Sequence, residues 1–132
     1  MPYERFEAWQ LCHELMLATY RNTKGFPSHE LYGLRSQARR AAFSAAANIA
    51  EGAAKRGANE FRRYLDISLG SLSELCYTLL VCRELGYLSR EQWRQLEELR
   101  NRAGQVTWKL YRSLGERPNR RPRSASTKRR QP

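Results

Sequence analysis

Apolar residues recur at intervals of three and four in four separate stretches of the chain. The first stretch covers residues 3–23. Its stripe consists of Phe6, Trp9, His13, Met16 and Tyr20, and Cys12 and Leu15 widen it. Such intervals place side chains on one face of an α-helix, so this stretch is predicted to be an amphipathic helix. Gly25 and Pro27 favour its end, because glycine accepts the exit conformation and proline bars continuation.

The second stretch, residues 28–55, is predicted to be a helix that Ser28 caps and that Glu30 stabilises through the helix dipole. It is rich in alanine, which gives high helix propensity and a thin cross-section that lets neighbouring backbones approach. The third stretch, residues 59–85, has Asn59 as its predicted cap and is the most apolar of the four. A helix that is apolar on more than one side is usually enclosed on more than one side.

The fourth stretch, residues 89–114, opens with Ser89 and has Gln92 three residues later, which is the pattern of a capping box. Its inner stripe consists of Trp93, Leu96, Leu99, Ala103, Val106, Leu110 and Leu114. No stretch alternates between apolar and polar residues with period two, so no strand is expected. Four helices joined by short loops fold most simply as an antiparallel, up-down-up-down four-helix bundle, and the predicted fold class is all-α.

Polar side chains interrupt the apolar pattern on one face of the second and third helices. This polar stripe comprises Gln37, Ser44, Asn48, Glu51, Ser71 and Glu74. Small and polar stripes can approach closely, so we expect hydrogen bonds between these two helices or across a subunit boundary. Buried carboxylates need partners, and Arg35, Arg39 and Arg40 of the same or a neighbouring protomer are the candidates. Acid–base catalysis by Glu51 and Glu74 is disfavoured, because no nucleophile, metal-binding histidine or phosphate loop accompanies them.

The chain is strongly basic. Its formal net charge of +11 comes from 24 lysines and arginines against 13 acids, and arginines dominate the cations. Arginine suits the recognition of phosphates and carboxylates, although a GC-rich coding bias produces the same composition. A field of this sign attracts nucleic acid or an anionic membrane without conferring specificity.

The bundle topology brings many of these cations together at one pole. The start of the first helix, the loop after the second and the end of the fourth meet there and gather Arg5, Lys55, Arg56, Arg62, Arg63 and Arg112. Solvated faces explain most charge runs, but Lys55, Arg56, Arg62 and Arg63 are the candidates here for contact with a phosphate backbone. The aromatic residues fall mostly on core stripes, so no stacking platform for single strands is expected.

Residues 115–132 differ in composition from the rest of the chain. They hold seven cations and three prolines and no large apolar residue. Such a segment cannot bury enough surface to repay its ordering entropy, so we expect a disordered basic tail. The tail adds further candidates for nucleic-acid contact, with a role in solubility as the alternative. These candidates are Arg117, Arg120, Arg121 and Arg123.

The remaining chemistry points away from a metal site or an enzyme. Cys12, Cys76 and Cys82 are an odd number without a close pair, which is typical of reduced core residues in a cytoplasmic protein. No glutamate stands three residues before His13 or His29, as a di-metal carboxylate bundle requires. Neither histidine follows an arginine at the spacing of toxin-type bundle ribonucleases. No apolar run approaches the ~20 residues of a membrane span, and no signal peptide is expected. We expect no cofactor, no metal and no enzymatic activity.

Several short motifs follow one another in a distinctive order. They are Trp9, the Phe26-Pro27 turn, Gln37 with Arg39-Arg40, Ser44 through Asn48-Ile49-Ala50-Glu51-Gly52, Phe61, Gly70-Ser71 with Glu74-Leu75, and Leu85-Gly86-Tyr87-Leu88. In this order they resemble the bacterial four-helix-bundle family named for proteins encoded in intervening sequences of 23S ribosomal RNA genes. The resemblance covers roughly residues 3–114 and leaves out the arginine-rich tail.

The resemblance implies a cytoplasmic bundle that assembles into a ring of five subunits and has no enzymatic activity. The family is also similar to the accessory proteins of diversity-generating retroelements, which are basic pentamers associated with nucleic acid and a reverse transcriptase. The leading hypothesis is therefore a homo-oligomer that binds RNA or DNA electrostatically. The alternative is a scaffold or adaptor ring that docks another protein. A membrane partner is not expected, because the core requires the apolar faces.

Overall fold

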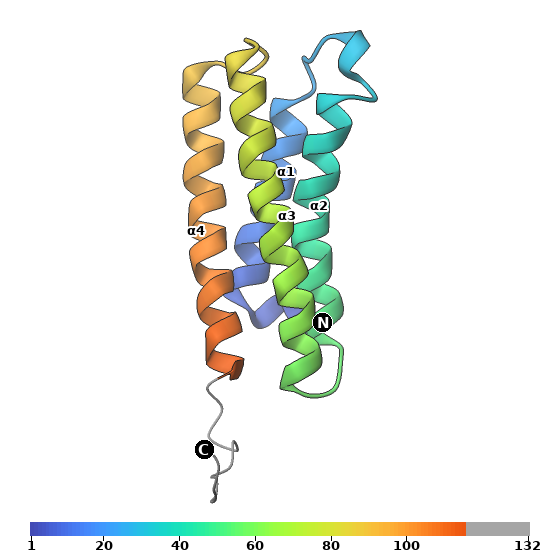
Figure 1. The fold of residues 1–132 in the computed structure, drawn as a ribbon, viewed down its shortest axis with the longest axis vertical. Coiled ribbons are helices and arrows are strands. Elements are labelled where there is room, and N and C mark those ends of the chain that lie inside the picture. Colours follow the sequence, from blue (N-terminus) through green and yellow to red (C-terminus); the bar gives the residue numbers. More distant parts are fainter. Residues whose placement is uncertain (116–132) are drawn as a thin grey trace, which may run out of the picture.

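The computed structural model describes residues 1–115 of the 132-residue chain. Every regular element in that range is helical, and the order is η1 (Pro2–Arg5), α1 (Glu7–Asn22), η2 (Ser28–Glu30), α2 (Leu34–Ala53), α3 (Ala58–Glu84) and α4 (Arg90–Gly115). The long helices lie side by side and the chain reverses at each loop (Figure 1). The predicted all-α class with four helices is confirmed. The predicted tail lies outside the described residues.

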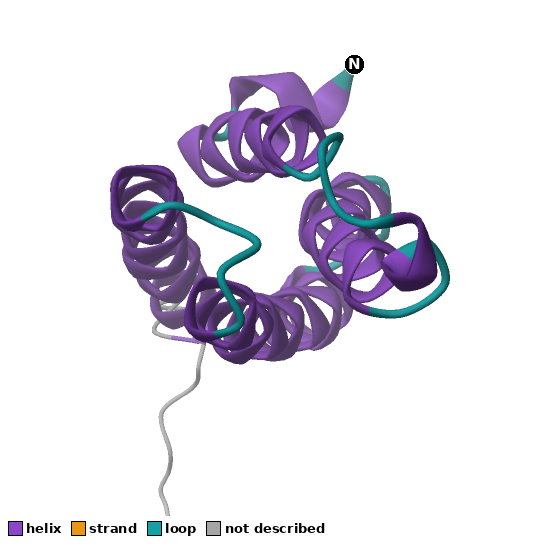
Figure 2. Cartoon of the chain, turned by 90° about the horizontal axis from the view of Figure 1, so that it is seen from above, coloured by secondary structure: helices purple, strands orange, loops and turns teal. Residues whose placement is uncertain are grey.

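The four long helices surround a common centre, as Figure 2 shows along the bundle axis. Each packs against the helix before it, and α1 completes the bundle by packing against α4. The fully buried side chains come from all four helices and include Leu15, Ile49, Leu72, Leu75 and Leu96. Burial of each such side chain contributes about 1.5–3 kcal/mol, so this apolar centre is the main source of stability.

Helix α2 packs closely against α3 because its inner face is built from small residues. The buried residues of α2 are Ala38, Ala41, Ala42, Ala45, Ala46, Ile49 and Gly52. The closest approach is at Gly52, where an added Cβ would lie 2.7 Å from the Cβ of Tyr64 and 2.9 Å from a ring carbon of Phe61. Between the two backbones, the buried hydroxyl of Ser68 donates to the carbonyl of Ala45 at 2.7 Å.

The helix starts differ from the predicted ones at three places. The first helix does not run from residue 3, because Pro2–Arg5 is a separate 3-10 helix, the backbone of Phe6 is extended, and α1 begins at Glu7. Helix α2 begins at Leu34, because Ser28–Glu30 forms a separate 3-10 turn and the chain turns again before α2. Ser28 is therefore not the cap of α2; instead, Oε1 of Glu30 accepts the backbone N–H of Leu34 at 3.0 Å. Helix α3 begins at Ala58 after Gly57, whose φ of 84° suits glycine. Asn59 consequently lies inside the first turn.

The capping box at the start of α4 is confirmed. The backbone N–H of Ser89 donates to Oε1 of Gln92 at 2.9 Å, and the backbone N–H of Gln92 donates to Oγ of Ser89 at 3.0 Å. These reciprocal bonds satisfy two donors that the first turn of a helix otherwise leaves unpaired.

Helix α3 is long and apolar enough to cross a membrane by length and composition alone. Such a helix is not expected from the sequence, because its uninterrupted apolar runs are short. Its inner side forms part of the bundle core through Leu65, Leu75 and Leu79. Its outer side is open, since Ile67 is 43% and Tyr77 69% exposed. The expectation that α3 is enclosed on more than one side is therefore wrong for the single chain.

The close approach of α2 and α3 predicts opposite effects for two glycine-to-alanine changes. Gly52→Ala should lower the free energy of unfolding by about 1–3 kcal/mol, because the new methyl group overlaps Tyr64 and Phe61. Gly70→Ala, at an exposed position of α3 with nothing near the added Cβ, should raise it by about 0.5–1 kcal/mol through helix propensity. Urea unfolding followed by circular dichroism measures both; a stabilising Gly52→Ala would contradict the packing described.

The carboxylate of Glu30 predicts a stability difference that depends on pH. The N–H of Leu34 and the hydroxyl of Tyr87 both donate to this carboxylate and lower the pKa of Glu30. A lowered pKa in the folded state contributes stability above the unfolded pKa of about 4.3, and this contribution is lost as the pH falls through the folded pKa. The Glu30→Gln variant should therefore be less stable than the native protein at neutral pH and approach it in acid.

The measurement is urea unfolding of both proteins from neutral pH down to about pH 3, below the unfolded pKa of a glutamate. Tyr87→Phe removes one of the two donors and should show part of the same dependence. A difference between native protein and Glu30→Gln that stays constant over this range would refute the capping role.

Candidate nucleic-acid interface

One end of the bundle brings together η1, the loop between α2 and α3, and the last turns of α4 (Figure 1). We call this end the basal pole and define it by Arg5, Lys55, Arg56, Arg62, Arg63 and Arg112. A hollow of about 380 Å³ there is lined by Arg5 and Lys55 together with Phe61 of α3 and Leu114 of α4. Cations that are far apart in the sequence therefore share this end of the molecule, as the bundle topology predicts.

Aromatic rings support the cations of the basal pole. The guanidinium carbon of Arg62 lies 4.3 Å from the ring centre of Tyr111, and Tyr111 stacks on Trp108 with centroids 5.4 Å apart. The guanidinium of Arg63 and the ammonium of Lys55 lie 4.8 and 5.4 Å from the ring centre of Tyr64. Each such contact contributes about 0.5–1 kcal/mol at exposed sites. It positions the cation without neutralising its charge.

These rings are the residues that the sequence interpretation missed. The expectation that the aromatic residues lie mostly in the core does not hold for Trp108, which is 49% exposed and stacks on Tyr111. The available signal was the position of Trp108 outside the inner stripe of the fourth helix. For Tyr64 and Tyr111, periodicity assigns a helix face but does not show which cation of a neighbouring helix lies over the ring.

The exposed acids Glu4, Glu7, Glu51 and Glu60 lie at the same end, but they form few ion pairs with its cations. Arg63 pairs with Glu60 at 3.4 Å, and that bond raises the pKa of Arg63. The side chains of Lys55 and Arg56 are exposed and form no ion pair or hydrogen bond within residues 1–115. Arg62 differs from them, since its Nε is buried and has no hydrogen-bond partner in the described part of the chain. The exposed candidates for a phosphate contact are therefore Lys55, Arg56 and Arg63.

The flank formed by α4 carries paired charges instead. Arg94 pairs with Glu91 at 2.7 Å and with Glu98 at 3.0 Å, and Arg100 pairs with Glu97. These pairs lie three or four residues apart on one helix, where opposite charges meet readily. These two guanidinium groups are neutralised locally, whereas Arg90, Arg102 and Lys109 of the same helix form no ion pair within residues 1–115.

The predicted polar stripe joins α2 to α3 within the chain. Gln37 donates to Glu74 at 2.9 Å, and the hydroxyls of Ser44 and Ser71 lie 2.8 Å apart. Asn48 donates to both the carbonyl and the hydroxyl of Ser44, at 2.9 and 3.1 Å. Polar side chains therefore connect the two neighbouring helices by hydrogen bonds at the bundle surface.

The expected pairing of buried carboxylates with arginines is not found in the single chain. Glu51 and Glu74 are both exposed, so neither requires a cationic partner. Arg39 donates to the hydroxyl of Thr23 at 2.8 Å and to the carbonyl of Tyr20 at 3.1 Å. Arg40 donates to the amide oxygen of Gln37 at 3.2 Å. These arginines contact neutral oxygens, because the acids near them face solvent.

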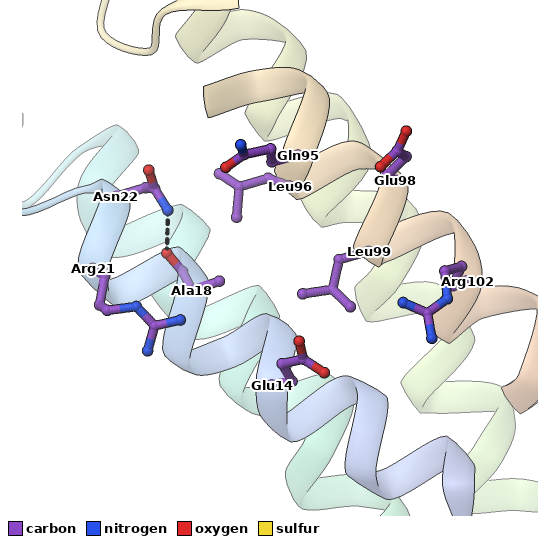
Figure 3. A pocket seen from close by; sticks show the side chains of 9 residues that line it. All are labelled: Glu14, Ala18, Arg21, Asn22, Gln95, Leu96, Glu98, Leu99 and Arg102. Atoms are coloured by element: carbon purple, nitrogen blue, oxygen red, sulfur yellow. Dashed lines mark hydrogen bonds between the residues drawn. The ribbon is translucent and has the colours of Figure 1, made fainter. Parts of the chain in front are cut away.

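A groove of about 390 Å³ separates α1 from α4 and offers no catalytic constellation. Figure 3 shows Glu14 and Arg21 on α1 and Glu98 and Arg102 on α4, with Leu96 and Leu99 between them. The two carboxylates and two guanidinium groups balance each other. The groove is lined by no cysteine, histidine or hydroxyl side chain, so it lacks a nucleophile.

The cysteines are poor candidates for nucleophilic catalysis. None of the three forms a disulfide within residues 1–115, and burial raises the pKa of Cys12 and of Cys82 to about 11. Thiols with such values are overwhelmingly protonated near neutral pH and are poor nucleophiles. Within residues 1–115, no group of three or more histidines, cysteines or acids is placed to hold a metal ion.

Comparison with known proteins agrees with the fold and with the motif order. The family model described as 23S rRNA-intervening sequence protein matches residues 4–109. A crystal structure of a protein of unknown function from the S23 ribosomal protein family of Bacteroides thetaiotaomicron has a TM-score of 0.71 and 19% identity, over 79% of this chain and 97% of that one. At that identity the likeness shows the fold alone. No curated protein matches the chain.

The family model covers most of the chain, including the segments from Trp9 to the Leu85–Leu88 loop that carry the resemblance. The membership inferred from the order of the motifs is thereby confirmed. This protein belongs to the 23S rRNA-intervening sequence protein family.

Proposed function

We propose that this protein is a non-enzymatic, self-assembling cytoplasmic protein that binds the phosphate backbone of RNA or DNA through its basal pole. The observation that carries the proposal is the group of exposed cations Lys55, Arg56 and Arg63, of which only Arg63 has a carboxylate partner, Glu60, within residues 1–115. Binding of this kind draws its free energy from released counterions and is weakly selective for sequence.

The half-exposed ring of Trp108 adds a second type of contact to the same surface. An unstacked base resting on an aromatic ring contributes about 1–3 kcal/mol and does so with little regard to base identity. Phosphate contacts by the cations and stacking on Trp108 together favour single strands or looped segments over regular duplex. Neither contact distinguishes RNA from DNA, because phosphates and base faces are common to both.

We further propose that the active form is a homo-oligomer, with five subunits as the family resemblance implies. A hollow of about 490 Å³ on the outside of α1 and α2 is lined by Trp9, Met16, Phe43 and Ala47, and Phe43 is 56% exposed. Contiguous apolar surface of this kind is typical of interaction sites. A ring of chains that each carry +11 would present tens of positive charges to a polyanion.

The second candidate function is a scaffold or adaptor ring that docks another protein without nucleic acid. The exposed apolar side chains favour it, because Phe43 and Ile67 suit a foreign protein surface as well as a second copy. In that case the positive charge serves solubility or the docking of an acidic partner. Purification from a native extract with and without nuclease separates the two functions, since only the first predicts a nuclease-sensitive companion.

The basal pole predicts a salt-dependent affinity that specific arginines control. In filter binding at about 50 mM salt, where backbone contacts are strong, the native protein should retain RNA and DNA. Arg56→Gln/Arg63→Gln should weaken retention and reduce the slope of log K against log salt by about 1.5–2, because two phosphate contacts are lost.

The matched control is Arg21→Gln/Arg102→Gln, which removes the same charge from exposed positions on α1 and α4. It should change the salt slope much less than the basal pair does. Absence of retention by the native protein would overturn nucleic-acid binding altogether. Equal losses in both double variants would show that the basal pole is not the binding surface.

The hollow on α1 and α2 that contains Phe43 predicts that one substitution will change the assembly state. Phe43→Glu places a charge in the proposed interface and should convert the native oligomer to monomers, because an unpaired buried carboxylate is costly. Light scattering coupled to size-exclusion chromatography measures the mass. Tyr77→Glu, at an exposed position of α3 outside that hollow, is the control and should leave the mass unchanged. A monomeric native protein would refute the assembly.

A further inference from the structure

Tyr32 lies almost entirely in solvent at the end of the bundle opposite the basal pole. It is 91% exposed, more than any other large apolar side chain among residues 1–115. It follows η2 and precedes α2, and its ring borders two adjacent hollows of about 380 and 370 Å³. Two hollows of this size that share one aromatic wall can each hold one part of a small ligand.

The first hollow is cationic. Arg35, Arg39 and Arg40 line it together with Tyr20, whose ring centre lies 4.5 Å below the guanidinium of Arg39. Arg35 forms no hydrogen bond or ion pair within residues 1–115, and the other two arginines donate only to neutral oxygens. Three guanidinium groups within six residues of one helix thus lack a carboxylate partner.

The close spacing of these charges is electrostatically unfavourable in the unliganded chain. Desolvation by burial and the nearby charge of Arg35 both lower the pKa of Arg39. A bound anion would offset the repulsion between the guanidinium groups. Their planar forks also match the oxygens of a phosphate group.

The second hollow has a mixed apolar and polar lining and carries another exposed aromatic ring. Tyr77 of α3, which is 69% exposed, lines it with Leu34 and Val81, and the polar groups of Gln37 and Thr78 border it. A planar heterocycle fits such a setting, because the aromatic rings offer surfaces for stacking.

Two acids lie near this surface, and neither forms an ion pair with the arginines. Glu74 accepts from the amide of Gln37 at 2.9 Å. Glu30 lines the second hollow, beside Tyr77, and does not line the cationic one. Its two oxygens accept from the backbone of Leu34 and from the hydroxyl of Tyr87, both at 3.0 Å. The carboxylate is therefore engaged in the fold, and the cationic hollow keeps its charge.

We propose that these two hollows form an apical site for a nucleoside phosphate, defined by Tyr32, Arg35, Arg39, Arg40 and Tyr77. The phosphates lie among the arginines, and the base lies beside Tyr32 and Tyr77. The ligand is either a free nucleotide or one nucleotide of a single strand, since both present the same groups. The site is separate from the basal pole, because the part of α2 that follows Arg40 and ends at Ala53 places about 20 Å between them.

Titration calorimetry on the full chain tests the apical site with three probes: ATP, tripolyphosphate and a short single-stranded oligodeoxyadenylate. The native protein should bind ATP more tightly than tripolyphosphate although ATP carries less charge, because only ATP has a base to stack. Tyr32→Ala should weaken ATP binding about tenfold and leave tripolyphosphate binding unchanged. Tyr32→Phe keeps the ring and should retain ATP affinity.

The cationic hollow is tested by Arg35→Gln/Arg40→Gln, which spares Arg39 because that residue bonds to Thr23 and Tyr20. This variant should weaken ATP and tripolyphosphate alike, whereas Arg21→Gln/Arg102→Gln, with the same loss of charge, should weaken neither appreciably. Circular dichroism confirms that each variant is folded.

The source of the nucleotide follows from the third probe. If the oligodeoxyadenylate competes with ATP and shows the same dependence on Tyr32, the site takes a strand; if only ATP binds, it takes free nucleotide. The apical site is overturned if ATP binds no better than tripolyphosphate or if Tyr32→Ala binds ATP as the native protein does. Filter binding by Arg56→Gln/Arg63→Gln tests the basal pole separately, so its outcome does not depend on whether the apical site binds ATP.

Discussion

The contact between α2 and α3 is the constraint on which the rest of the molecule depends. Small residues on α2 bring the two backbones so near that Ser68 bonds directly to the carbonyl of Ala45 and Gly52 leaves no room for a methyl group. This contact fixes the rotation of α2 about its own axis. Alanines occupy most of the inner face of α2. The larger side chains of this helix, which are Phe43 and the arginines near its start, therefore point outward. Both proposed surfaces on α2 are thus consequences of one tight helix pair.

Much of the fold could be predicted from the sequence, and the exceptions have local physical causes. Helical periodicity and short loops are sufficient for four helices, and the Ser89–Gln92 box is a strong signal because both bonds are local. The start of α2 could not be placed in the same way. Ser28 with Glu30 suits the first turn of a helix, but here that turn is an isolated 3-10 segment, and Glu30 caps α2 from outside it.

The candidate sites were predictable to a lesser degree. Chain topology alone brings Arg56 and Arg63 to one pole, since the loop between α2 and α3 must lie at an end of the bundle. The stacking of Arg62 on Tyr111 and the closeness of Tyr111 to Trp108 were not predictable, because they depend on the relative rotation of two helices. Tyr32 was missed for another reason: it lies in a turn between helices, where neither periodicity nor composition indicates exposure.

The ion pairs along α4 also bear on the rate at which the protein would associate with a polyanion. Arg94 and Arg100 are matched by glutamates on their own helix, so these two cations add little to the pull on an approaching polyanion. The cations without an ion pair, among them Lys55 and Arg56 at one end of the bundle and Arg35 near the other, contribute most of that pull. A long negatively charged chain would rotate the protein during its approach, before any atoms touch, and productive encounters would become more frequent than random collision allows. Added salt would slow capture more than it would hasten release.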